Sequence, residues 1–171
     1  MRRVLLALLL SIAAVFTAQA QKYALIDMEY ILKNIPAYER ANEQLNQTSK
    51  KWQSEVEKLA EEAKTLYKNY QSESVFLSDE QKTQKEEEII AKEKAVAELR
   101  RQYFGPEGEL YKKQESLMRP IQDEIYNAVK EISNQKGYAL VIDRASASSI
   151  IYASPSIDIS NEVLARLGYS K

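Results

Sequence analysis

The chain has 171 residues, carries 24 basic and 25 acidic side chains, and contains neither cysteine nor histidine. The missing cysteines exclude a small fold stapled by disulfides, and without His or Cys ligands no zinc or copper centre is expected. The balance of charge also argues against nucleic acid as a partner, since nucleic-acid-binding proteins present a basic face.

The first twenty residues are predicted to be a secretory signal peptide. Arg2 and Arg3 precede an apolar run from Val4 to Phe16, and Ala18-Gln19-Ala20 supplies a small-x-small cleavage site. A retained membrane anchor is the alternative, but the run is shorter than the roughly 20 apolar residues that a spanning helix needs. The predicted mature chain begins at Gln21, is expected to form one domain with no transmembrane segment, and leaves contact with a membrane surface open.

The first structural element of the mature chain is predicted to be a strand. Tyr23–Asp27 is a short and nearly continuous apolar run, as expected of a buried strand. Asp27 at its end is a good N-cap for a helix that begins near Met28.

A long helix is predicted to follow, because no glycine or proline occurs between Pro36 and Gly105 and good helix formers dominate. The apolar positions recur at steps of three and four, with Thr48 filling one place, and this spacing predicts a coiled-coil seam with one stutter around Trp52. The seam comprises Tyr38, Ala41, Leu45, Trp52, Val56, Leu59, Ala63, Leu66 and Tyr70.

The pattern is interrupted at residues 72–77 and restarts at Ser78, which forms a predicted capping box with Gln81. A return helix with the seam Ile89, Lys92, Val96, Leu99 and Tyr103 is expected to fold back on the first helix. The sequence thus predicts an antiparallel helical arm over about 37–109 with its tip at 72–78. Counting from the turn places Trp52 opposite about Leu99.

Gly105-Pro106-Glu107-Gly108 is predicted to break the return helix. It lacks the glycine spacing and the lysine of a phosphate-binding P-loop, and no other nucleotide motif occurs, so neither ATP nor another cofactor is expected. The seam resumes with Leu110, Leu117, Ile121, Ile125, Ala128 and Ile132, and Gly137 is the expected C-cap.

The C-terminal part is predicted to complete a small sheet. Tyr138–Asp143 resembles the first strand, Ser149–Ala153 is a third strand candidate, and a short helix is expected over Ile159–Leu167, capped by Asp158 and stopped by Gly168. This body, residues 21–36 and 110–171, buries too little to stand alone, so oligomerisation is expected. The residues assigned to the oligomer interface are Leu25, Ile26, Leu140, Val141, Ile142, Ile150 and Ile151.

The order of these elements resembles the Skp (OmpH-like) family of periplasmic outer-membrane-protein chaperones. The resemblance covers the mature chain and rests on Tyr23–Asp27, Ile31–Pro36, the long hairpin, Leu140–Asp143 and Asp158-Ile159-Ser160 with Val163 and Leu164. It implies an α+β fold, a homotrimer with three helical tentacles on a small β-sheet body, and periplasmic binding of unfolded outer-membrane proteins without ATP.

A holdase needs scattered apolar and amphipathic contacts, and tyrosine provides both an apolar ring and a polar end. The predicted client contacts are Tyr67, Tyr70, Val75, Phe76 and Leu77. An alternative interpretation is that Phe76 and Leu77 fold over the end of the hairpin and cover its last seam layer.

Two other functions remain open at this stage. A structural or adaptor coiled coil of the cell envelope would share the seam, but it favours a continuous rod over a hairpin that returns to a sheet. An enzyme could use Asp27 and Asp143 as a carboxylate pair. Helix capping by Asp27 and a turn at Asp143 explain the same residues without catalysis, and no catalytic residue is assigned.

Overall fold

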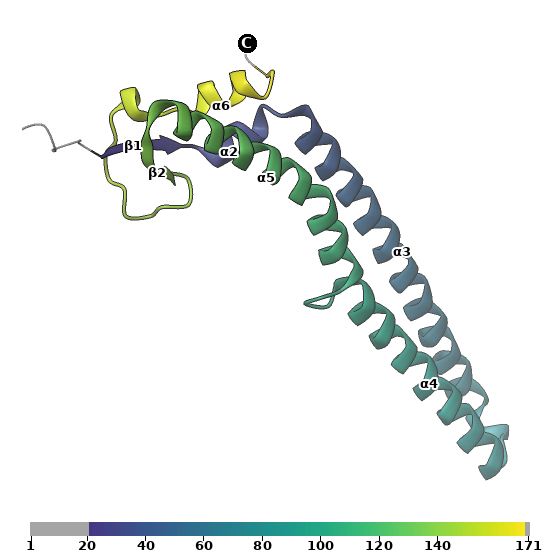
Figure 1. Cartoon of the computed structure of the whole chain (residues 1–171). Coiled ribbons are helices and arrows are strands. Elements are labelled where there is room, and N and C mark those ends of the chain that lie inside the picture. The colour runs from purple at the N-terminus through teal and green to yellow at the C-terminus, as the bar shows by residue number, and fades with distance from the viewer. Residues whose placement is uncertain (1–20, 170–171) are drawn as a thin grey trace, which may run out of the picture. The chain divides into compact units, whose positions relative to one another are not determined.

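The computed structural model describes residues 21–169, so the predicted signal peptide lies outside the described residues. This part of the chain is mostly helical and has one small two-stranded sheet (Figure 1), as the predicted fold class requires. No helix within residues 21–169 combines the length and the apolar character needed to cross a membrane. The elements are β1 (Lys22–Ile26), α2 (Met28–Lys33), α3 (Pro36–Glu73), η1 (Ser74–Phe76), α4 (Asp79–Phe104), α5 (Glu109–Lys136), β2 (Tyr138–Asp143), η2 (Pro155–Ile157) and α6 (Ser160–Arg166).

The described chain forms two compact units, residues 21–34 with 124–169 and residues 35–123. In the first unit, β1 and β2 are parallel neighbours, and Ile26 pairs with Asp143. The two similar apolar runs of the sequence are therefore both strands, as predicted. The hydrophobic core of this unit consists of Ala24, Leu25, Ile26, Ile31, Ile125, Ala128, Ile132, Ile159, Val163 and Leu164.

The predicted third strand at residues 149–153 was wrong, because this segment is irregular. The outer edge of β1 is taken by the chain at 158–159, where the N–H of Ile159 donates to the carbonyl oxygen of Leu25 at 2.9 Å. Ile151 is 100% exposed and Tyr152 is 83% exposed, so these side chains pack against little or nothing of residues 21–169. Strand propensity without a partner strand or a packed face does not make a strand.

The helix caps largely follow the sequence prediction. The Asp27 carboxylate accepts from the N–H of Tyr30 at 2.8 Å and caps α2. Gly137 ends α5 at φ +71°, a conformation that L-residues rarely adopt. The last helix is shorter than predicted, and Asp158 accepts from the N–H of Ser160 at 2.9 Å while Ile159 holds the N-cap position.

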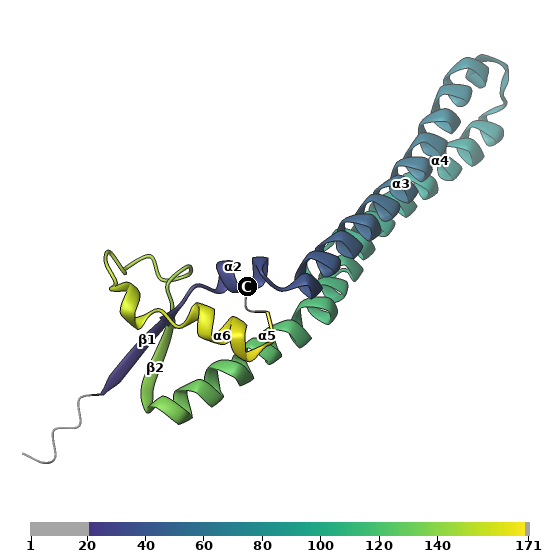
Figure 2. The same ribbon diagram turned by 90° about the horizontal axis from the view of Figure 1, so that it is seen from above.

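In the second unit, α3 and α4 lie side by side (Figures 1 and 2). Every residue of the two predicted seams is buried or half-buried, and Val56, Ala63 and Ile89 are the most enclosed of those between α3 and α4. The cross-contacts pair rising numbers on α3 with falling numbers on α4: Glu55 with Tyr103, Glu62 with Lys92 and Tyr70 with Glu86.

The predicted register between these helices was wrong by one turn. Trp52 stacks on Tyr103, not on Leu99, with ring centroids 4.8 Å apart and ring planes 8° from parallel. The reason is that α3 runs to Glu73 and η1 follows directly, so the chain reverses near Leu77 and not near the middle of the interrupted segment. Moving the reversal point by one residue shifts each pairing between α3 and α4 by two positions, so a displacement of about two residues gives the observed shift of one turn.

The Gly105–Gly108 segment separates α4 from α5, as predicted. The N–H of Gly105 donates to the carbonyl of Arg101, and the N–H of Gly108 donates to the carbonyl of Gly105 at 2.9 Å. Gly108 is buried against backbone: a Cβ at this position would lie 2.8 Å from the carbonyl oxygens of Gln102 and Tyr103. A glycine is therefore required at position 108, because the backbone of residues 102 and 103 approaches too closely to leave room for a side chain.

Candidate functional site

The turn between α3 and α4 presents the most exposed apolar cluster of the second unit. Val75 is 78% exposed and Phe76 is 86% exposed, while Leu77 is half-buried. Leu77 is therefore partly covered by the chain, whereas Phe76 is too exposed for the predicted covering role. Covering hydrophobic side chains as exposed as these with a binding partner is favourable, because it removes apolar surface from water.

Polar contacts hold this turn without the help of Val75 or Phe76. The N–H of Ser74 donates to the carbonyl of Tyr70, and the N–H of Leu77 donates to Ser74. Ser78 and Gln81 form the predicted capping box, with the Ser78 N–H to the Gln81 side chain at 3.0 Å and the Gln81 N–H to the Ser78 hydroxyl at 3.3 Å. Because these bonds set the backbone, the two apolar side chains are free to contact a ligand.

The two tyrosines predicted as contacts differ in their surroundings. Tyr67 is 47% exposed, and its hydroxyl accepts from the Gln71 amide at 3.1 Å. Tyr70 is half-buried, and its hydroxyl donates to the Glu86 carboxylate across the helix pair. This bond raises the pKa of Tyr70, because ionisation would place two negative charges together. Tyr70 therefore mainly joins the two helices, whereas Tyr67 is available to a ligand.

Tyr67 also lines a groove that the sequence did not reveal. The groove has a volume of about 290 Å³, and its floor is made by small residues of α3 facing α4. Its lining comprises Ala60, Ala63, Lys64, Tyr67, Glu93 and Val96. The alanines of the seam could have signalled it, because small seam residues leave space beside a longer neighbour. The groove can take one apolar side chain of an extended peptide.

The contacts between α3 and α4 include an ion pair and an aromatic stack. Lys92 binds Glu62 at 3.0 Å, and this hydrogen bond and the lysine charge lower the pKa of the Glu62 carboxyl. Tyr103, stacked on Trp52, donates to Glu55 at 2.6 Å, which raises the pKa of its hydroxyl. These contacts fix which residues of the two helices lie together.

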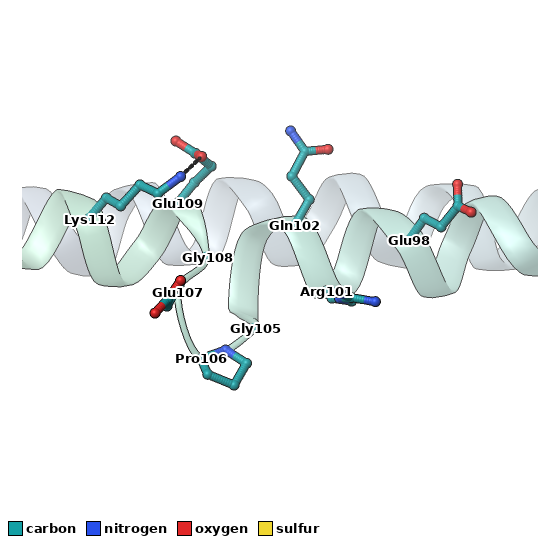
Figure 3. A pocket seen from close by; sticks show the side chains of 9 residues that line it. All are labelled: Glu98, Arg101, Gln102, Gly105, Pro106, Glu107, Gly108, Glu109 and Lys112. Carbon is teal, nitrogen blue, oxygen red and sulfur yellow. Dashed lines mark hydrogen bonds and ion pairs between the residues drawn. The ribbon is translucent and has the colours of Figure 1, made fainter.

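A hollow of about 590 Å³ lies beside the Gly105–Gly108 segment (Figure 3). Figure 3 shows Gln102 and the Glu109–Lys112 pair on one side of the ribbon and Pro106 on the other. The Lys112 ammonium donates to Glu109 at 3.0 Å. The polar groups diverge, so this hollow does not assemble a set of groups aimed at one ligand.

The predicted carboxylate pair lies together in the first unit, at the same end of β1 and β2. The Asp143 carboxylate accepts from the N–H groups of Met28 and Ala145, each at 3.0 Å, and Asp27 caps α2. Arg144 binds Asp27 at 3.1 Å and Asp158 at 3.5 Å. In the part of the chain that the structure describes, no group of three or more acidic residues is placed to hold a metal ion. Capping and ion pairing account for both carboxylates.

The residues predicted for the oligomer interface separate into an inner and an outer group. Leu25 and Ile26 are buried within the chain, Val141, Ile142 and Ile150 are half-buried, and Leu140 and Ile151 are exposed. Leu140 also lines a hollow of about 540 Å³ between β2 and α5, together with Ile26, Ile125, Tyr126 and Val129 among others. The first unit thus leaves an apolar surface unpartnered.

The fold is that of mostly helical proteins in which two long paired helices are inserted between the strands of a small parallel sheet. The model of the outer membrane protein (OmpH-like) family matches residues 22–167. The chaperone protein Skp of Yersinia enterocolitica is 27% identical over 155 residues, which cover 91% of each chain. Skp of Photorhabdus luminescens is 25% identical over 173 residues, covering 96% of this chain and 98% of that protein.

A solved structure has the same fold. It is a candidate OmpH-like outer membrane chaperone from Caulobacter crescentus CB15, with a TM-score of 0.70 at 12% identity, covering 86% of this chain and 83% of that one. The family match extends from β1 to α6 and includes both units. The chain therefore belongs to the OmpH-like family of outer membrane proteins.

Proposed function

We propose that this protein is an ATP-independent holdase of the periplasm that binds unfolded outer-membrane proteins and keeps them soluble. The observation that carries the proposal is the family match over residues 22–167, with Skp chaperones as relatives along nearly the whole chain. Export would follow cleavage of the signal peptide after Ala20. The protein acts by binding and not by catalysis.

In this proposal α3 and α4 form an antiparallel coiled-coil arm, and its tip contacts clients. Val75 and Phe76 supply exposed apolar area, and Tyr67 adds an amphipathic ring at the adjacent groove. Leu77 and Tyr70 support the tip from within. Several weak contacts exchange faster than one tight contact, so the client can leave without ATP.

The first unit is the oligomer body in this proposal, and the assembly is a homotrimer. Exposed Leu140, Ile151 and Tyr152 and the apolar hollow between β2 and α5 support an interface there, because a single chain leaves them in water. Two short strands form a marginal sheet alone, and further strands or partner chains would stabilise it.

The test uses the mature protein, from Gln21 onward, and a urea-unfolded β-barrel protein of an outer membrane. Light scattering of the mixture after dilution should give a trimer that forms a soluble stoichiometric complex with the unfolded chain. A monomer or rod-like dimer that leaves the β-barrel protein to aggregate would refute the proposal and favour a structural coiled coil.

The tip is tested by Phe76→Ser, with Ile90→Ser as the matched control. Both side chains are largely exposed, but Ile90 lies on α4 away from the tip. We expect Phe76→Ser to weaken protection of the client and Ile90→Ser to leave it unchanged, with equal thermal stability. If Phe76→Ser and its combination with Leu77→Ser leave both protection and thermal stability unaltered, the tip does not contact clients.

A further inference from the structure

The charged side chains around the exposed tip are predominantly negative. Residues 68–88 contain six carboxylates against three lysines. Two of the lysines are already paired, Lys82 with Asp79 at 3.7 Å and Lys85 with Glu88 at 3.2 Å. The carboxylates are Glu73, Asp79, Glu80, Glu86, Glu87 and Glu88, and the third lysine, Lys68, is exposed.

Three of these carboxylates are unpaired and exposed. Glu86 accepts from Tyr70, whereas Glu73, Glu80 and Glu87 make no ion pair or hydrogen bond with side chains in the region that the structure describes. Glu73 is the last residue of α3, directly before η1, and Glu80 lies in the first turn of α4. Glu73 and Glu80 each lie within four residues of Phe76 in the sequence, so the Cα atom of either residue is at most about 14 Å from that of Phe76 even in an extended chain. Two turns along α4, Glu87 lies on the same face as Glu80.

We propose that the tip binds polypeptide segments in which an apolar side chain is flanked by lysine or arginine. The apolar side chain packs against Phe76 and Val75, and the flanking cations lie near Glu73 and Glu80. This inference rests on the proposed holdase function and specifies the chemistry of the segment that the tip selects. Segments with acidic flanks and surfaces rich in lipid phosphate are disfavoured, because they bring like charge to the tip.

The size of the preference follows from the exposure of the carboxylates. Each exposed ion pair changes an equilibrium constant by about 1.4- to 5-fold, and a like-charge contact acts in the opposite direction. Two or three such contacts give an expected preference of about tenfold for basic over acidic flanks at low salt. At about 0.5 M salt the Debye length is below about 5 Å, and the preference should fall to less than about twofold.

The experiment measures fluorescence anisotropy of three labelled peptides with the mature protein. The peptides share an apolar centre of leucine and phenylalanine and carry lysine, glutamine or glutamate flanks. The expected order of affinity is lysine, glutamine, glutamate at low salt, with the order lost at high salt. Equal affinities at low salt, or a preference that survives high salt, would overturn the inference from the wild-type protein alone.

Matched variants then locate the effect. Glu73→Gln/Glu80→Gln/Glu87→Gln should abolish the order, because it removes exposed charges without breaking an ion pair. The control, Glu39→Gln/Glu107→Gln/Asp123→Asn, makes the same change of charge at exposed positions outside residues 68–88 and should preserve the order. An unchanged order in the tip variant, or tip-dependent binding to phosphatidylglycerol vesicles that matches the lysine peptide, would contradict the proposal.

The same samples separate this inference from the proposed function. A protein that protects the unfolded β-barrel client but shows no order among the peptides remains a holdase, and only the selection by charge is wrong. A protein that fails to protect the client refutes the proposed function, whatever the peptides do.

Discussion

Replacing Gly108 by alanine is expected to destabilise the connection between α4 and α5. The new Cβ would lie 2.8 Å from the carbonyl oxygens of both Gln102 and Tyr103 and 2.9 Å from the amide nitrogen of Gly105. Ordinary contact begins at 3.4 Å, so the surroundings must move by about 0.6 Å. All three atoms belong to the backbone, and a rotation of a side chain cannot relieve the contact.

The cost of such overpacking is about 1–3 kcal/mol. In a chain of this size each kcal/mol lowers the melting temperature by about 2–4 °C, so a loss of about 2–12 °C is expected. Circular dichroism during heating and urea unfolding measure both quantities. Glu107→Ala is the matched control, because Glu107 is an exposed residue of the same segment. A Gly108→Ala protein as stable as the Glu107→Ala protein would show that this close approach is absent in solution.

Two further predictions concern helix ends, and a third concerns the carboxylate of Asp143 at the end of β2. Gly137→Ala should lower the free energy of unfolding by about 1 kcal/mol through backbone strain at φ +71°, because nothing lies within 4 Å of the new Cβ and steric contact adds no further cost. Gly137→Asn should cost less in the same urea titration, because asparagine adopts this conformation more readily than alanine. Ser78→Ala should lower stability by about 1 kcal/mol by removing the cap of α4, whereas Ser78→Asp should restore most of it; equal unfolding of all three proteins would argue against the cap. Partial burial is the largest influence on the pKa of Asp143 and acts to raise it, but hydrogen bonds from Met28, Ser146 and Ala145 together outweigh it and lower the pKa. The stability from ionised Asp143 is therefore present above its unfolded pKa of about 3.9 and is lost as the pH falls through the lower folded value. Asp143→Asn should remove this part of the acid dependence, and acid unfolding curves that coincide for both proteins would contradict it.

Local chemistry explains what was predictable from sequence. The period of the α-helix fixed the seam from Tyr38 to Tyr70, and all its members are buried or half-buried. Asp27, Ser78 and Gly137 act within three or four residues of their own position, so their capping roles could be inferred without knowledge of the rest of the chain.

The candidate site was predicted only in part, because some of its features depend on contacts that are not local in the sequence. The interrupted pattern at residues 72–78 placed Val75, Phe76 and Leu77 in one turn, but it did not tell which of them the helices would cover. That outcome depends on where α3 ends and on the polar bonds of the turn, which leave Phe76 bare and half-bury Leu77. The groove beside Tyr67 depends on the register of two helices and was not visible in either one.

The sequence by itself determined the helices, their seams, their caps and the two similar strands, because each depends on contacts between residues close in the chain. Only the tertiary structure decided that Trp52 meets Tyr103, since a reversal about two residues later along the chain shifts every pairing between α3 and α4 by one turn. It also decided that residues 149–153 form no strand, because a strand exists only where a neighbouring edge accepts its hydrogen bonds, and the chain at 158–159 already occupies the edge of β1.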